Sequence, residues 1–168
     1  MNKKIFSENC NLSSYTTIKV GGVAEYFAEP RSVEELSYLI KWANLNKQRC
    51  QIIGAGSNLL INNIFIKGLV VCTKKLKSLK IEPYSGIVEA EAGVMLPTLS
   101  NSLAKNGLQG GEWAVGIPGT LGGAIYMNAG TGNLSLAKNL ISVKVINNKT
   151  HEKFEIEKKD INFEYRFS

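Results

Sequence analysis

The sequence has few of the residues on which hydrolytic and metal-dependent enzymes rely. Its 168 residues include one histidine and three cysteines. His151 lies in a polar, charged stretch and is interpreted as a surface residue. A serine–histidine mechanism is therefore disfavoured, because the sequence has no other histidine to act as the base. Cys10, Cys50 and Cys72 are odd in number and lack C-x-x-C spacing. They argue against a disulfide framework and a zinc site, and they favour a reducing cytoplasm.

Arginine and long apolar runs are equally scarce. The net charge of +6 comes mostly from lysines, which are scattered except for a cluster between Lys74 and Lys80. Aromatic residues and arginines do not alternate with that cluster, so a solvated strand edge explains it better than a nucleic-acid groove. No apolar run could span a bilayer, and residues 1–11 lack the apolar segment of a signal peptide. We therefore expect a cytoplasmic protein that binds neither nucleic acid nor membrane.

Glycine, in contrast, is abundant and concentrated. Nine of the sixteen glycines lie between Gly107 and Gly132, although each glycine costs folding entropy. The spacing Gly116-x-x-Gly119-x-x-Gly122-Gly123 leads into an apolar segment that is compatible with a helix. This pattern predicts an anion-binding turn at a helix N-terminus. A tight turn between closely packed elements is the structural alternative.

Periodicity predicts a strand–helix–strand unit with parallel strands near the start of the chain. Its parts are an extended arm at 11–22, a strand at 23–29, a helix capped by Ser32 that runs to about Asn46, and a strand at 49–53. The second strand ends at Gly54-Ala55-Gly56-Ser57-Asn58-Leu59, which lacks the third glycine and the helix of a dinucleotide fingerprint. A pyrophosphate-binding loop and a plain serine–asparagine turn both remain open.

Further along, the pattern changes to strands of an antiparallel sheet, with a domain boundary near residue 68. The predicted elements are strands at 69–73, 76–81 and 86–91, a helix from Pro97 to a C-cap at Gly107, and a hairpin pairing 140–146 with 153–156. The length allows one domain or two small ones.

Four segments then occur in a characteristic order. They are Thr16-Thr17-Ile18-Lys19-Val20-Gly21-Gly22, Gly54-Ala55-Gly56-Ser57-Asn58-Leu59-Leu60, the stretch from Gly116 to Gly130, and Tyr165-Arg166-Phe167-Ser168. Together they closely resemble the UDP-N-acetylenolpyruvoylglucosamine reductase (MurB) family, from about Asn11 to Ser168. The third segment is the most specific of the four.

The resemblance implies an α+β flavoprotein of the vanillyl-alcohol-oxidase (PCMH) type. Residues 1–67 would form an N-terminal FAD-binding subdomain, and residues 68–168 a second, truncated FAD-binding subdomain. In the family, NADPH reduces the flavin, which passes hydride to UDP-N-acetylglucosamine enolpyruvate and yields UDP-N-acetylmuramate for peptidoglycan. A bacterial, cytoplasmic oxidoreductase of cell-wall synthesis is therefore expected.

The resemblance also implies roles for individual residues. Arg166 would steady the enolate-like intermediate and the substrate carboxylate, a role that suits a planar, permanently charged donor fork. Tyr165 beside it would support the substrate, with a packed strand tyrosine as an equal alternative. The FAD diphosphate would lie on Gly54, Ala55, Gly56, Ser57, Asn58 and Leu59, and the rest of the flavin on Gly116, Ile117, Pro118, Gly119, Thr120, Gly122, Gly123 and Ala124.

The sequence departs from the family after Ser168. The substrate-binding domain, the serine proton donor and the catalytic glutamate normally follow that point, and a positioned general acid is commonly worth about two to four orders of magnitude in rate. We expect the chain alone to be inactive, as a fragment, a truncation, or one half of a protein completed by a C-terminal fragment. A non-catalytic flavin- or nucleotide-binding module, and an interaction domain with purely structural glycines, are the alternatives.

Overall fold

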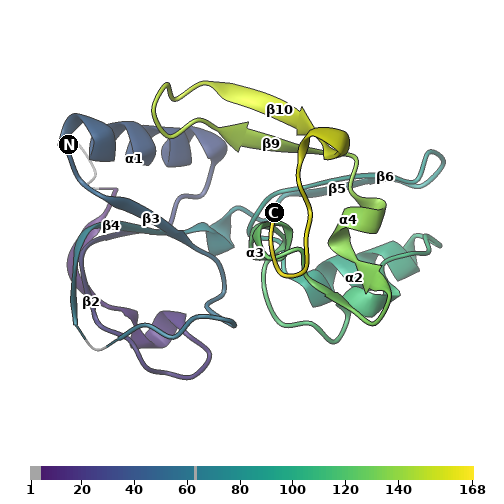
Figure 1. Ribbon diagram of the computed structural model, residues 1–168, viewed down its shortest axis with the longest axis horizontal. Helices are drawn as coiled ribbons and strands as arrows, with labels where there is room; N and C mark the ends of the chain where they lie inside the picture. The colour runs from purple at the N-terminus through teal and green to yellow at the C-terminus, as the bar shows by residue number, and fades with distance from the viewer. Residues whose placement is uncertain (1–4, 63) are drawn as a thin grey trace. The chain divides into compact units, whose positions relative to one another are not determined.

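The computed structural model describes residues 5–62 and 64–168, which fold as two compact units (Figure 1). The first unit runs to Leu76 and also includes Ile146–Glu152, whereas the second comprises Lys77–Val145 and Lys153–Ser168. The boundary expected after residue 67 falls inside a strand of the first unit. A single boundary cannot describe this arrangement, because residues Ile146–Glu152 return to the first unit.

The first unit is built on a four-stranded sheet in the order β1-β2-β4-β3. The strands are β1 (Ser7–Asn11), β2 (Val23–Ala28), β3 (Cys50–Ile53) and β4 (Phe65–Cys72). β1 is antiparallel to β2, while β2 and β3 each run parallel to β4. The parallel orientation predicted for 23–29 and 49–53 is therefore confirmed, with β4 inserted between the two strands.

The prediction that 69–73 belongs to an antiparallel sheet in the second region is wrong. Residues 69–72 are all buried, because β4 is a central strand with both faces covered. Leu69 and Val71 pack towards helix α1 (Val33–Leu45), together with its Leu39 and Ala43. A continuous apolar run of this kind is typical of parallel strands, and alternation gives no clue to it.

The opposite face of β4 is covered by the short 3-10 helix η1 (Leu12–Tyr15). Leu12 is completely buried there and shares a core cluster with Val70 and Cys72 of β4. Burying a leucine or valine side chain is worth about 1.5–3 kcal/mol, so the central strand is the main energetic support of the unit. Helix α1 begins as predicted at Ser32, whose side chain accepts from the Glu35 N–H.

The second unit consists of hairpins and short helices. Its elements are β5 (Leu79–Glu82), β6 (Ile87–Ala90), α2 (Leu96–Lys105), α3 (Leu121–Tyr126), β7 (Gly130–Thr131), β8 (Leu134–Ser135), α4 (Leu136–Asn139), β9 (Ser142–Ile146) and β10 (Lys153–Glu157), with the 3-10 turns η3 (Glu112–Ala114) and η4 (Lys158–Asp160). A further 3-10 turn, η2 (Thr73–Lys75), follows β4 in the first unit. β5 pairs antiparallel with β6, and β9 pairs with β10. These pairings and α2 confirm the sequence predictions, whereas β1 was not predicted.

The core of the second unit is made largely of small residues. Ala114, Ala124 and Ala129 are buried together with Leu96 and Leu136. Small side chains let α3 lie close to its neighbours, which places the glycine-rich stretch against the body of the unit.

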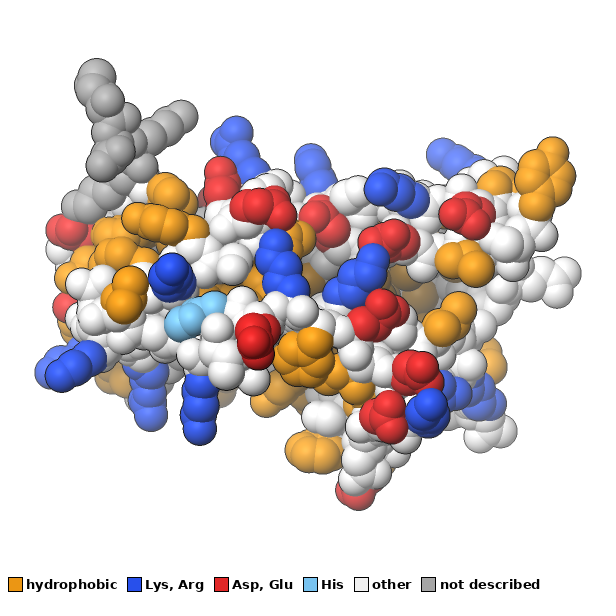
Figure 2. All heavy atoms as spheres, turned by 90° about the horizontal axis from the view of Figure 1, so that it is seen from above, with side chains coloured by type: hydrophobic (Ala, Val, Ile, Leu, Met, Phe, Trp, Pro, Cys, Tyr) orange, Lys and Arg blue, Asp and Glu red, His pale blue; other side chains and the backbone are white. Residues whose placement is uncertain are grey.

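Charged groups are dispersed on the surface. On the face drawn in Figure 2, lysine and arginine side chains alternate with acidic ones and form no continuous basic area. Within residues 5–62 and 64–168, no helix is long and apolar enough to cross a membrane. The same residues contain no group of three His, Cys, Asp or Glu side chains placed to hold a metal ion.

Candidate functional site

The first candidate loop, Gly54–Leu59, follows the carboxyl end of β3. Gly56 adopts a φ of +67°, and a Cβ at this position would lie 2.0 Å from the Tyr15 carbonyl oxygen. The Thr17 N–H donates to the Gly56 carbonyl at 3.2 Å. Glycine is therefore required at residue 56 by the protein itself, because the loop presses against the η1 segment.

The hydrogen bonds of this loop leave several of its backbone donors available. The carbonyls of Ile53 and Gly54 accept from the side chains of Thr73 and Cys72, at 3.2 and 3.5 Å. In contrast, within the described part of the chain no group accepts from the amides of Ala55, Gly56 and Asn58. Neighbouring free N–H groups at a strand end form a concavity suited to an anion, so the loop fits a diphosphate.

Two side chains that border this loop, Tyr15 and Cys72, have raised pKa values. Burial raises the pKa of the Tyr15 phenol, and the negative charge of Glu29 raises it further. Burial likewise raises the pKa of the Cys72 thiol. Both side chains stay protonated, so neither provides a nucleophile or a charge that would repel a phosphate.

The second candidate loop, Gly116–Gly119, precedes α3. Its carbonyl end is anchored, since Gly119 O accepts from Leu96 N at 3.0 Å. The amides of Gly116 and Gly119 donate to no residue that the structure describes. Gly116 is exposed, and a Cβ there would have no neighbour within 4 Å. This loop, too, offers unpaired donors and open space.

The sequence predicted that the N-terminus of the following helix, α3, offers free N–H groups to an anion, and this prediction is wrong. The first three N–H groups of α3 already have partners within the protein. Leu121 N donates to Val94 O at 2.7 Å, Gly122 N to Ala92 O at 2.8 Å, and Gly123 N to the Thr120 hydroxyl at 3.4 Å. The sequence could not reveal the first two of these bonds, because their acceptors, Val94 O and Ala92 O, come from a turn about thirty residues earlier that no motif marks.

The adjacent glycines of α3 differ in their surroundings. A Cβ on Gly122 would lie 2.9 Å from the Cβ of Ala92, whereas one on Gly123 would meet only the Thr120 hydroxyl at 3.5 Å. Thr120 and Ala124 are buried and support the helix from within. Gly122 thus serves packing, and Gly123 keeps the exposed surface flat.

Tyr165 and Arg166 lie on a tight turn near the end of the chain. Glu164 and Phe167 bond to each other through both N–H groups, at 3.0 and 3.3 Å. Arg166 has a φ of +59° and its guanidinium carbon lies 5.4 Å from the Tyr165 ring centroid. Tyr165 is 89% exposed, so the packed-tyrosine alternative is wrong. Arg166 forms no ion pair with the described residues, which leaves its fork available to an anion.

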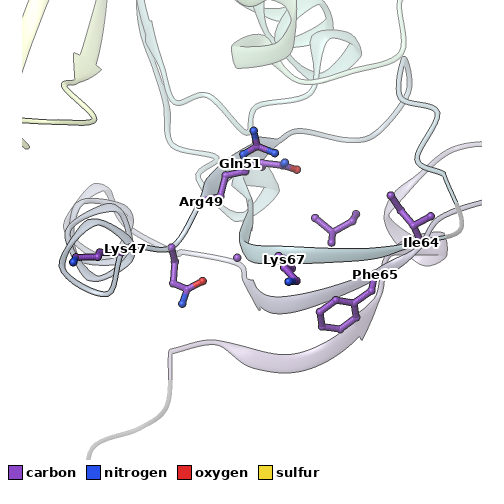
Figure 3. A pocket seen from close by; sticks show the side chains of 9 residues that line it. Lys47, Arg49, Gln51, Ile64, Phe65 and Lys67 are labelled. Atoms are coloured by element: carbon purple, nitrogen blue, oxygen red, sulfur yellow. The ribbon is translucent and has the colours of Figure 1, made fainter.

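A separate pocket of about 560 Å³ lies at the amino ends of β3 and β4, away from the Gly54–Leu59 loop (Figure 3). Lys47, Arg49 and Lys67 give it a positive lining without acidic residues. Sequence reasoning missed it because these side chains come from separate segments. None of the predicted site residues lines this pocket.

Comparison with known proteins places the fold and the cofactor. Residues 24–151 match the family model described as "FAD binding domain". A UDP-N-acetylenolpyruvoylglucosamine reductase of Prochlorococcus marinus subsp. pastoris is 71% identical over 163 residues, which are 97% of this chain and 55% of the relative. The chain spans about half the length of the curated relatives that it matches.

Two solved structures share the fold of this chain. The UDP-N-acetylenolpyruvylglucosamine reductase of Thermus caldophilus superposes with a TM-score of 0.74 at 31% identity, over 96% of this chain and 56% of that one. An alkyldihydroxyacetonephosphate synthase superposes with a TM-score of 0.70 at 16% identity, over 94% of this chain and 33% of that one, and shows the shared fold alone. The α+β, vanillyl-alcohol-oxidase-type fold is thus confirmed, and FAD is its cofactor. The chain belongs to the FAD-binding domain family.

Proposed function

We propose that this chain is the FAD-holding part of an NADPH-dependent reductase that converts UDP-N-acetylglucosamine enolpyruvate to UDP-N-acetylmuramate in the cytoplasm. The observation that carries the proposal is the 71% identity to a reductase of that name along almost the whole chain. The FAD-binding roles of the two predicted subdomains, and the roles of the individual site residues, are parts of this proposal.

The residues present fit FAD in two places. The free amides of Ala55, Gly56 and Asn58 would hold the diphosphate, with Ser57 and Leu59 beside them. The open Gly116 and Gly123 would let the backbone approach the rest of the cofactor, with Ile117, Pro118 and Gly119 completing the loop. Thr120, Gly122 and Ala124 would act by shaping α3. Bound FAD supplies hydride transfer between NADPH and the enolpyruvyl group.

The role of Arg166 is to bind and orient. Its unpaired guanidinium would receive the substrate carboxylate, or an enolate oxygen, through paired N–H donors. Tyr165 would hold the guanidinium plane through its ring, a contact worth about 0.5–1 kcal/mol at exposed sites. Charge that develops on the substrate oxygen is then stabilised without reorganisation of the site.

The test has two arms. In the first, the purified chain is mixed with FAD and its visible absorbance is measured after removal of free cofactor. Retained flavin is expected, and a colourless protein would leave only the interaction domain with structural glycines. In the second, NADPH oxidation that depends on the enolpyruvyl substrate is measured with and without the remaining half of the Prochlorococcus marinus relative.

We expect turnover only in the completed mixture. Arg166→Ala should then reduce kcat/KM about a hundredfold or more, as removal of an oxyanion donor does, with FAD retention unchanged. Flavin retention without turnover in any mixture would favour the non-catalytic flavin-binding module instead.

A further inference from the structure

The segment that carries Arg166 is fastened to the end of α3. The Asn128 Nδ2 atom donates to the Glu164 carbonyl at 2.9 Å. Two residues earlier, the Tyr126 carbonyl accepts from the Ser168 hydroxyl at 3.2 Å. These two bonds hold both sides of the turn that presents Tyr165 and Arg166, and Figure 1 shows the end of the chain beside α3.

Asn128 occupies this position at a cost to stability. Its φ of +41° is one that asparagine tolerates better than most residues. Its side-chain oxygen is buried and has no partner among the described residues, and an unsatisfied buried acceptor costs about 1–3 kcal/mol. The one bond that the structure gives to this amide is therefore the bond to Glu164, and packing does not explain the residue.

The turn itself is strained at Arg166. A positive φ at arginine is uncommon and costs of the order of 1–3 kcal/mol, so surrounding contacts must hold it. The reciprocal bonds between Glu164 and Phe167 close the turn, but they do not fix it to the rest of the unit. Asn128 supplies a fixed point on the Glu164 side of the turn, and the Ser168 hydroxyl supplies one on the other side.

We propose that Asn128 is a positioning residue for Arg166, which ties the arginine turn to the same helix whose opposite end carries the Gly116–Gly123 flavin loop. The proposal rests on the proposed function of Arg166 as an anion receptor. The helix then sets the place of the guanidinium relative to the cofactor loop, and the amide acts only through the arginine.

The variant Asn128→Gly tests this, because glycine accepts the left-handed backbone and adds no charge. The matched control is Asn106→Gly. Asn106 ends α2 and donates through Nδ2 to the Ser102 carbonyl at 2.8 Å, so the same kind of bond is lost away from the turn. Each protein is loaded with FAD, completed with the remaining half of the Prochlorococcus marinus relative, and titrated with UDP-N-acetylglucosamine enolpyruvate. The change in flavin absorbance gives the substrate Kd.

Asn128→Gly should raise the substrate Kd about tenfold, the effect of one lost hydrogen bond to a positioning group, with FAD affinity within about threefold of the parent. Asn106→Gly should leave both constants unchanged. In the Arg166→Ala background, Asn128→Gly should have no further effect, because the two residues act as one unit. Additive losses in that double variant would overturn the proposal.

Each remaining outcome is also decisive. An unchanged substrate Kd in Asn128→Gly, with FAD bound, contradicts the inference and leaves the proposed function intact. Loss of FAD in the parent chain contradicts the proposed function itself. If Asn128→Gly does not fold, Asn128→Asp replaces it, since it keeps the shape and removes the donor, and the same comparison with Arg166→Ala separates its charge from its positioning effect.

Discussion

The two glycine loops use the same residue for different reasons. In the loop at 54–59, Gly56 is required by a backbone carbonyl 2.0 Å from where a Cβ would stand. In the loop at 116–123, Gly116 and Gly123 meet no such obstacle. A glycine whose Cβ would clash with the protein itself is needed to shape the loop. A glycine without such a clash is the better candidate for contact with a ligand.

Gly56→Ala should have the largest effect, because it adds a clash with Tyr15 O to an unfavourable φ. We expect a loss of about 3 kcal/mol or more in the free energy of unfolding and no retained FAD. The control is Gly107→Ala, which has a similar φ of +70° but no atom within 4 Å, and which should cost about 1 kcal/mol. Equal urea midpoints for the two variants would show that the clash relaxes freely.

Substituting the neighbouring glycines of α3 separates packing from ligand contact. Gly122→Ala should lower the free energy of unfolding by about 1–3 kcal/mol through overpacking against Ala92. Gly123→Ala should leave the cofactor-free protein unchanged or up to about 1 kcal/mol more stable, yet weaken FAD binding. Thermal unfolding without FAD and a flavin titration give the two quantities. Unaltered FAD affinity in Gly123→Ala would remove this residue from the flavin site.

Thr120→Val removes the cap of α3 and keeps the side-chain volume. Thr120 is buried and its hydroxyl accepts from Gly123 N, so we expect a loss of about 1 kcal/mol. Hydrogen exchange of the α3 amides should accelerate, while those of α1 keep their rates. Equal acceleration in both helices would mean that the two units unfold together.

The smallest effect concerns an exposed ion pair of the second unit, Lys144 with Glu89 at 2.7 Å. The hydrogen bond and charge of Lys144 lower the pKa of Glu89. A lowered carboxyl pKa stabilises the fold above the pKa of the unfolded chain, and this contribution is lost as the pH falls through the folded value. Glu89→Gln should therefore flatten the acid side of the stability profile slightly, measured by urea unfolding between neutral pH and the acid range.

Local signals in the sequence predicted much of this structure. Ser32 marked the start of α1, and Pro97 with Gly107 marked the limits of α2, because caps and turn residues act within one helical turn. The Gly54–Leu59 loop was placed correctly after a strand. Whether its residues hold FAD stays a prediction.

Non-local features escaped prediction. The sequence does not indicate that Ala92 and Val94 occupy the first donors of α3, because that pairing depends on tertiary packing. Likewise, an apolar run such as 69–72 suits either an antiparallel or a central parallel strand, and periodicity does not choose between them. The bond from Asn128 to Glu164 joins positions 36 residues apart, and no local pattern marks it.

The position of β4 has a consequence for synthesis. β1 and β2 can pair as soon as both have emerged from the ribosome, but β3 has no neighbour until β4 follows it. The central strand of the sheet is thus the last of the four to be made, and the apolar faces of α1 and η1 stay without their main partner until then. Completion of the four-stranded sheet must therefore wait for Cys72, and a pause in translation before that residue would prolong exposure of an aggregation-prone intermediate.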